Sequence, residues 1–134
     1  MLAQRLTRRL CPRCRVAQPA SDQEIQALAE EYCFGTALKP SEQVDRWRAT
    51  YGALMTYKPV GCRICSGIGY AGRLALFELL VASPEIKRLI LRHGTVEQVA
   101  AQARAEGMRT LKQDGIEKVL QGLTTIDQVR AASN

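Results

Sequence analysis

The sequence predicts a mainly α-helical fold with a short β element, a tetracysteine subdomain and a C-terminal cluster of short helices. Three observations lead to this fold class. The composition is rich in leucine and alanine, with 46% hydrophobic but only 5% aromatic residues, which is typical of a helical protein. Two Cys-x-x-Cys pairs lie far apart in the chain, and one helical pattern repeats after residue 82. We divide the chain into a tetracysteine subdomain, residues 1–82, and a helical subdomain, residues 83–134.

The first segment, residues 2–10, predicts a short amphipathic helix. Leu2, Leu6 and Leu10 are spaced four residues apart, and arginines lie between them. Apolar residues at this spacing fall on one side of an α-helix. We therefore expect a helix that leads directly into the first cysteine pair.

Two more helices are expected before the second cysteine pair. Ser21 and Glu24 match a capping box, in which the serine accepts from a backbone amide and the glutamate bonds back. This pattern predicts a helix over about 22–33. Pro40 then interrupts the pattern, and Ser41 is the expected cap of a shorter helix. The apolar side of that helix carries Val44, Trp47 and Tyr51.

Residues 73–81 predict a buried strand. The run is apolar on both alternating faces except at Glu78, and a strand buried on both faces has this pattern. Leucine and alanine do not favour strands, and a run this short cannot be assigned from its period alone. A helix therefore remains the alternative for this segment.

The residues after 82 predict four short helices. Each begins with a serine or threonine that can cap it, and three of the four caps have a glutamine three residues later. A glycine ends each of the first three helices, as expected where the chain must leave a helix. The four predicted caps are Ser83, Thr95, Thr110 and Thr125.

The net charge of +6 is concentrated near the N-terminus, where residues 1–20 contain no acidic residue. Such a basic run can face phosphates, but a solvated charged surface is commoner, and we favour it. No stretch approaches the roughly 18 to 20 apolar residues of a membrane span. We therefore expect a cytoplasmic protein. The basic residues of this segment are Arg5, Arg8, Arg9, Arg13 and Arg15.

The two cysteine pairs, Cys11 with Cys14 and Cys62 with Cys65, are the strongest chemical signal in the chain. In a reducing compartment such pairs are more often metal ligands than disulfides. Each turn directs two sulfurs to one side, which supplies half of a tetrahedral zinc site with bonds of about 2.3 Å. Four thiolates leave no position for water, so the expected Zn²⁺ is structural. Iron in the same ligand set is chemically possible, and a redox-active dithiol pair is the main alternative.

No catalytic or cofactor-binding residue is predicted. Cys33 has no partner in sequence and should pack in the core, while His93 ends a predicted helix and is given no chemistry. Residues 67–72 match Gly-x-Gly-x-x-Gly, but they follow a cysteine turn and precede a strand, which is the wrong context for a dinucleotide site. We expect these glycines to allow a tight chain path. The chain also lacks a Gly-x-x-x-x-Gly-Lys-[Ser/Thr] phosphate loop, which excludes complete P-loop ATPase activity for this polypeptide.

Several short motifs occur in one order along the chain. In the tetracysteine subdomain they are Gln4-Arg5-Leu6, Cys11-Pro12-Arg13-Cys14, Gly61-Cys62-Arg63-Ile64-Cys65, Gly69-Tyr70-Ala71-Gly72-Arg73 and Glu78-Leu79-Leu80. In the helical subdomain they are Gly107-Met108-Arg109-Thr110-Leu111, Asp114-Gly115 and Gly122-Leu123-Thr124-Thr125. Together they resemble the C-terminal region of the bacterial secretion ATPases, the cytoplasmic motors of type II secretion and type IV pilus assembly.

The resemblance implies a zinc subdomain attached to a RecA-like ATPase core, in an enzyme that works as a hexamer at the inner membrane. Only the four paired cysteines carry over as ligands. The family's phosphate loop, magnesium-binding carboxylates and histidine box lie upstream of this segment, so ATP is expected only in the full-length family enzyme. Gln4, Arg5 and Leu6 would lie at the seam with the core, and Arg73 and Glu78 are candidate ion-pair or interface residues.

We therefore predict a zinc-stabilised C-terminal domain of a secretion or pilus motor, with a structural and coupling role. Its expected partners are further copies in a hexamer and an inner-membrane platform protein, with a location peripheral to the inner membrane. Whether the machine secretes proteins or builds pili stays open. The alternatives are a zinc ribbon that binds nucleic acid, although its basic segment lacks aromatic residues for base stacking, and a thiol-disulfide redox protein.

Overall fold

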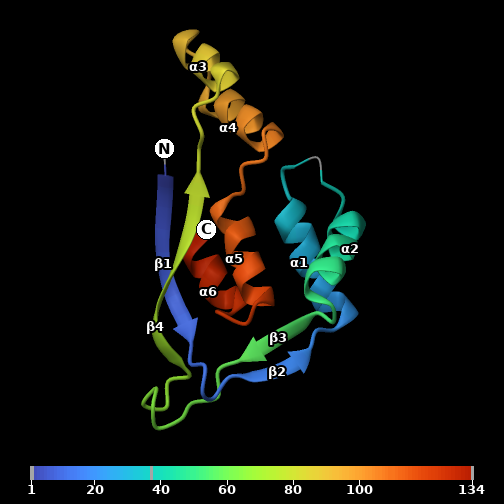
Figure 1. Ribbon diagram of the computed structural model, residues 1–134, viewed down its shortest axis with the longest axis vertical. Helices are drawn as coiled ribbons and strands as arrows, with labels where there is room; N and C mark the ends of the chain where they lie inside the picture. Colours follow the sequence, from blue (N-terminus) through green and yellow to red (C-terminus); the bar gives the residue numbers. More distant parts are fainter. Residues whose placement is uncertain (1, 37, 134) are drawn as a thin grey trace.

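The computed structural model describes residues 2–36 and 38–133 of the chain. Within these residues there are six helices and two small antiparallel sheets of two strands each. Figure 1 shows an elongated molecule. A long β-ribbon runs along one side, most of the helices lie on the other, one helical hairpin extends from one end, and the second sheet lies toward the opposite end. Helices and a tetracysteine cluster are thus present as predicted, but the strand content is larger.

The long ribbon consists of β1 (Leu2–Leu10) and β4 (Tyr70–Leu79), which pair antiparallel. The helix predicted over residues 2–10 is therefore wrong. A spacing of four residues places side chains on one face of a strand as well as on one side of a helix, because four is an even number. Pairing with β4, which lies sixty or more residues away in the sequence, makes this segment a strand rather than a helix. The strand predicted over residues 73–81 is confirmed, with slightly earlier bounds.

The second sheet pairs β2 (Val16–Pro19) with β3 (Met55–Lys58), also antiparallel. Neither strand was predicted. Each has only four residues, which is too short for an alternating pattern to be recognised. The pair connects the cysteine turns to the first two helices (Figure 1).

Helices α1 (Asp22–Cys33) and α2 (Pro40–Tyr51) follow this sheet and the loop after α1. The prediction of a helix over 22–33 is confirmed, and the Ser21 hydroxyl accepts from the Glu24 amide at 3.1 Å. The second helix begins two residues earlier than predicted, with Lys39 rather than Ser41 at the N-cap. Proline fits the first turn of a helix because its missing N–H would have no helical partner there.

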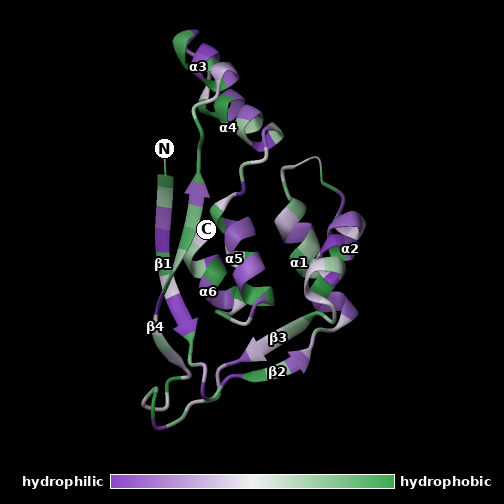
Figure 2. Cartoon of the chain, in the orientation of Figure 1, coloured by the Kyte–Doolittle hydropathy of each residue, from purple (hydrophilic) through white to green (hydrophobic). Residues whose placement is uncertain are grey.

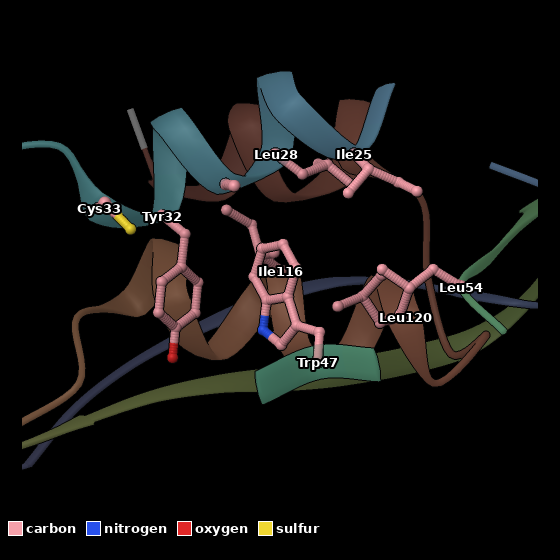
Figure 3. Close-up of a cluster of buried hydrophobic side chains, with 9 residues drawn as sticks. Ile25, Leu28, Tyr32, Cys33, Trp47, Leu54, Ile116 and Leu120 are labelled. Atoms are coloured by element: carbon pink, nitrogen blue, oxygen red, sulfur yellow. The ribbon is translucent and has the colours of Figure 1, made fainter. Parts of the chain in front are cut away.

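The main hydrophobic core lies between α1, α2 and α5 (Leu111–Leu120). Trp47 is only 2% exposed, and its ring meets Tyr32 edge-on with centroids 5.3 Å apart. The Trp47 indole N–H donates to the Glu117 carboxylate at 3.1 Å. Cys33 lies in the same cluster, which confirms its predicted core position. Figure 3 shows this cluster, which contains Ile25, Leu28, Ala29, Tyr32, Cys33, Trp47, Leu54, Ile116 and Leu120.

The predicted C-terminal helices are present as α3 (Pro84–Leu91), α4 (Val96–Ala105), α5 and α6 (Ile126–Ser133). Complete capping boxes open α4 at Thr95 and α5 at Thr110. Helices α3 and α4 form the hairpin at one end of the molecule (Figure 1). Figure 2 shows that a hydrophobic stretch leads from β4 toward this hairpin.

Helices α5 and α6 cover one face of the β1–β4 ribbon. Leu76 on β4 and Val129 on α6 are both fully buried in a small second cluster with Val119. The Thr7 hydroxyl on β1 donates to the Gln128 carbonyl on α6 at 3.1 Å. No helix among the described residues combines the length and the apolar character needed to cross a membrane.

Candidate metal centre

Two turns that are distant in sequence bring the four paired cysteines together. The Sγ atoms of Cys11 and Cys62 are 3.8 Å apart, as are those of Cys14 and Cys65, and Cys62 lies 3.7 Å from Cys65. All four sulfurs lie within 4.8 Å of one another. Cys11 and Cys65 are buried, while the other two are half-buried. These four residues form a cluster that could hold a metal ion.

The donor set fits a tetrahedral Zn²⁺ site. Four sulfurs at about 2.3 Å from a central ion would be about 3.8 Å from one another, which agrees with the three sulfur distances above. Thiolates are soft ligands that favour zinc or iron over magnesium or calcium. Cysteine geometry and chemistry therefore both suit a closed, structural metal site.

The position of this cluster follows from the connection of the two sheets. The turn at Cys11–Cys14 joins β1 to β2, and the turn at Cys62–Cys65 joins β3 to β4. The Cys11 amide also donates to the Gly69 carbonyl at 3.0 Å. The two sheets thus meet at the cysteine turns (Figure 1), and a metal ion there would link both connections.

Backbone N–H groups point at the sulfurs from several sides. The Gly61 amide lies 3.3 Å from the Cys14 sulfur, and the amides of Cys62 and Gly69 each lie 3.2 Å from the Cys65 sulfur. Gly69 has a φ of 88°, and a side chain there would meet Pro59. The tight chain path is thus confirmed at Gly69, whereas Gly67 and Gly72 have positive φ but no atom within 4 Å of a Cβ placed there.

These contacts shift the pKa values of the thiols in the absence of a metal. Burial raises the pKa of Cys14 to about 11. Burial also acts to raise the pKa of Cys65, but the N–H groups of Cys62 and Gly69 outweigh it and lower that pKa to about 6. The backbone N–H of Arg13 is the main cause of a lowered pKa at Cys11. Because metal ligation requires thiolates, metal binding should release protons from the thiols that are still protonated, and the raised pKa of Cys14 makes it one of them.

Other candidate residues lie outside this cluster. Arg73 and Glu78 are five residues apart on β4, so they lie on opposite faces of the strand and do not form an ion pair with each other. Residues 67–69 lead into β4, of which residues 70–72 are the start, and no helix follows this motif directly. This agrees with the rejection of a dinucleotide site. His93 follows α3 with a φ of 56° and is exposed.

Sequence reasoning missed a polar contact between α5 and the open edge of β4. The Asp114 carboxylate accepts from the Phe77 amide at 2.8 Å and from Lys118 at 2.7 Å. Lys118 also donates to the Ala75 carbonyl at 2.7 Å. Two side chains thus satisfy backbone groups that a neighbouring strand would otherwise pair with. An aspartate and a lysine four residues apart in a predicted helix were the available signal.

Comparison of the sequence with known proteins identifies the family of the chain. The family model described as "Type II/IV secretion system protein" matches residues 1–131. The chain belongs to this family. The match includes all four clustered cysteines and most of residues 83–134, and it confirms the family that the sequence motifs indicated.

Curated relatives from both branches of the family are similar to the chain. The type IV pilus assembly ATPase PilB of Thermus thermophilus is 37% identical over 98% of the chain. The type II secretion system protein E of Aeromonas hydrophila is 35% identical, and PilB of Pseudomonas aeruginosa is 31% identical, each over 96% of the chain. The chain spans only 13%, 22% and 20% of these three relatives, respectively.

Proposed function

We propose that this chain acts as a zinc-stabilised C-terminal region of a motor ATPase for type II secretion or type IV pilus assembly. Cys11, Cys14, Cys62 and Cys65 hold one structural Zn²⁺. ATP binding and hydrolysis belong to the rest of such a motor, and this region contributes rigidity and passes movement between its neighbours. The observation that carries the proposal is the clustering of four sulfurs within 4.8 Å of one another, in a segment that matches the family from residue 1 to residue 131.

The proposed partners follow from the same family placement. In the complete motor the region lies in a homo-oligomer, a hexamer, and transmits movement to an inner-membrane platform protein. Its proposed location is the cytoplasmic side of the inner membrane. Nucleic acid is not a proposed partner.

Metal analysis tests the zinc site directly. We expect about one zinc per chain in protein purified without added metal, with four thiols that react only after chelation. The fifth cysteine, Cys33, is buried in the helical core, and its reactivity should be slow with or without chelator. A folded, metal-free protein with rapidly reacting cysteines would contradict the site and favour a thiol-disulfide redox function.

A segment exchange tests the motor function. Residues 1–131 would replace the matched segment in the type II secretion protein E of A. hydrophila and in PilB of P. aeruginosa. We expect at least one exchange to retain protein secretion or pilus assembly, and the better one identifies the machine. The same exchange carrying Cys65→Ser should lose that activity, while Cys33→Ser should keep it. Soluble, zinc-loaded exchanges that support neither process would refute the motor role without affecting the zinc assignment.

A further inference from the structure

The turn between α5 and α6, residues 121–125, lies against the segments that flank the cysteine pairs. On the side of the first pair, the Leu10 amide donates to the Leu123 carbonyl at 2.9 Å. The Thr124 hydroxyl donates to the Arg8 carbonyl at 2.8 Å, and Thr124 is fully buried. The last residues of β1 before Cys11 are therefore hydrogen-bonded to this turn.

The residue after the first pair contacts the same turn. The Arg15 guanidinium donates to the Gly122 carbonyl and lies 4.9 Å from the ring centroid of Tyr57 on β3. Gly122 has a φ of 80°, and a Cβ there would lie 2.7 Å from Arg15 and 2.8 Å from Tyr57. Only glycine can therefore occupy this position without moving Arg15 or Tyr57.

The second cysteine pair also reaches this turn. Tyr70, five residues after Cys65, shares a hydrogen bond of 3.0 Å with the Thr125 hydroxyl. Leu10, Arg15 and Tyr70 thus all contact residues 122–125. Leu10 precedes the first cysteine pair, Arg15 follows it, and Tyr70 follows the second pair. Leu10 and Tyr70 belong to the β1–β4 ribbon, whereas Arg15 immediately precedes the β2–β3 sheet. The contacts therefore depend on how the two sheets are held relative to each other at the cysteine turns.

We propose that the tetracysteine cluster is a metal-dependent clamp for the α5–α6 turn, with Arg15 as its positioning residue. A bound metal holds the two cysteine turns together and so keeps Leu10, Arg15 and Tyr70 against residues 122–125. Loss of the metal releases residues 121–125, while the core of α1, α2 and α5, against which Ile126 packs, stays folded. This inference rests on the proposed metal site and adds a conformational role to it.

The release is local because the far part of α6 has its own contacts. Val129 is fully buried and packs against Gly115 of α5, where it leaves no room for a Cβ. Arg130 pairs with Glu31 of α1 at 3.1 Å. The core around Trp47 includes no residue of either cysteine turn, so its packing does not depend directly on the metal.

Amide hydrogen exchange on the whole chain, with and without chelator, tests the clamp. The reporters are the amides of Leu10, Gly122 and Leu123, which bond to the carbonyls of Leu123, Val119 and Lys118. We expect chelation to speed their exchange at least about tenfold while the α1 amides stay protected, since local opening is governed by local contacts. Unchanged exchange at the reporters, or equal loss of protection in α1, would refute a local clamp.

Arg15→Met, with Arg13→Met as the matched control, tests the positioning role at full metal content. We expect Arg15→Met to speed exchange at Gly122 and Leu123 about tenfold, because a charged hydrogen-bond donor is lost. Arg13→Met should leave both amides unchanged. Equal behaviour of the two zinc-loaded variants would overturn the role of Arg15. Zinc content measured on the same samples separates the outcomes: absent zinc refutes the proposed metal site, and bound zinc without an effect refutes the clamp.

Discussion

Two regions of this molecule are held together by different forces. The helical core is the buried cluster of α1, α2 and α5 around Trp47. The cysteine end, residues 10–19 and 55–70, buries few apolar side chains, and Val60, Ile64 and Ile68 are 62%, 65% and 58% exposed. Burial of apolar surface stabilises the first region, whereas the second has hydrogen bonds and four converging thiols. The cysteine end should therefore depend on its ligand in a way that the helical core does not.

Removal of one cysteine ligand should have the largest effect on stability, and the effect should fall on the cysteine end rather than on the helical core. We expect Cys65→Ser to abolish zinc binding and to destabilise the cysteine end by several kcal/mol, because the free energy of structural zinc binding contributes to folding. Unfolding followed by Trp47 fluorescence and by exchange at the cysteine end should then separate into two transitions.

Cys33→Ser is the matched control, since Cys33 is buried in the helical core and lies outside the cluster. It should retain zinc and lose about 1 kcal/mol through the buried hydroxyl. Loss of zinc from both variants, or from neither, would contradict the assignment of the ligands.

A large cavity in the helical core should have the next largest effect. Trp47→Ala should lower the free energy of unfolding by about 3 to 5 kcal/mol, because it removes a fully packed ring and leaves a cavity. Zinc content should stay near one per chain. Urea unfolding with elemental analysis measures both quantities.

Phe34→Ala provides the control for aromatic content, since Phe34 is 88% exposed. Its effect should stay within about 0.5 kcal/mol. A loss of zinc in Trp47→Ala under native conditions would show that the two regions are not independent.

Loss of the contact between α5 and the edge of β4 should lower the free energy of unfolding by an intermediate amount. Asp114→Asn should lower the free energy of unfolding by about 1.5 to 3 kcal/mol, because a charged acceptor for the Phe77 amide and Lys118 is lost. Asp45→Asn, on the exposed face of α2, should change stability by less than about 0.5 kcal/mol. Equal stability of both variants in urea unfolding would argue against a stabilising role for the Asp114 contact.

The smallest effect is expected at the ion pairs of α1. Burial acts to raise the pKa of Glu31, but hydrogen bonds and charge from Arg130 and Lys112 outweigh it and lower the pKa below its ordinary 4.5. A lowered folded-state pKa contributes stability above the ordinary value, and this stability is lost as the pH falls through the folded pKa. Because these groups are partly exposed, the contribution should be below about 1 kcal/mol.

Glu31→Gln should therefore be less stable than the parent chain at neutral pH, and the difference should shrink as the pH falls below 4.5. Glu30→Gln is the neighbouring control, since the Glu30 carboxylate accepts a hydrogen bond from Gln26 on the same helix. Urea midpoints at several pH values measure both. A difference that grows on acidification would contradict the direction of the Glu31 pKa shift.

Local patterns in the sequence were enough for most of the helices and for the candidate ligands. The caps at Ser21, Thr95 and Thr110 bond to amides three residues away, so their signal lies within one helical turn. The cysteine pairs were recognised for the same reason, because each Cys-x-x-Cys turn is a local structure. Family motifs added the placement among secretion ATPases, which the family model confirms.

The tertiary structure alone decided the features that depend on distant partners. Leu2, Leu6 and Leu10 suit either a helix or a strand, and only pairing with β4 makes this segment a strand. The short β2–β3 sheet and the contact of Asp114 with β4 likewise join segments far apart in the chain. The same is true of the contacts that Leu10, Arg15 and Tyr70 make with residues 122–125. The sequence by itself determined the structures whose contacts join residues only a few positions apart, such as helix caps and cysteine turns. Long-range hydrogen bonds and packing, which have no local pattern, determined the rest.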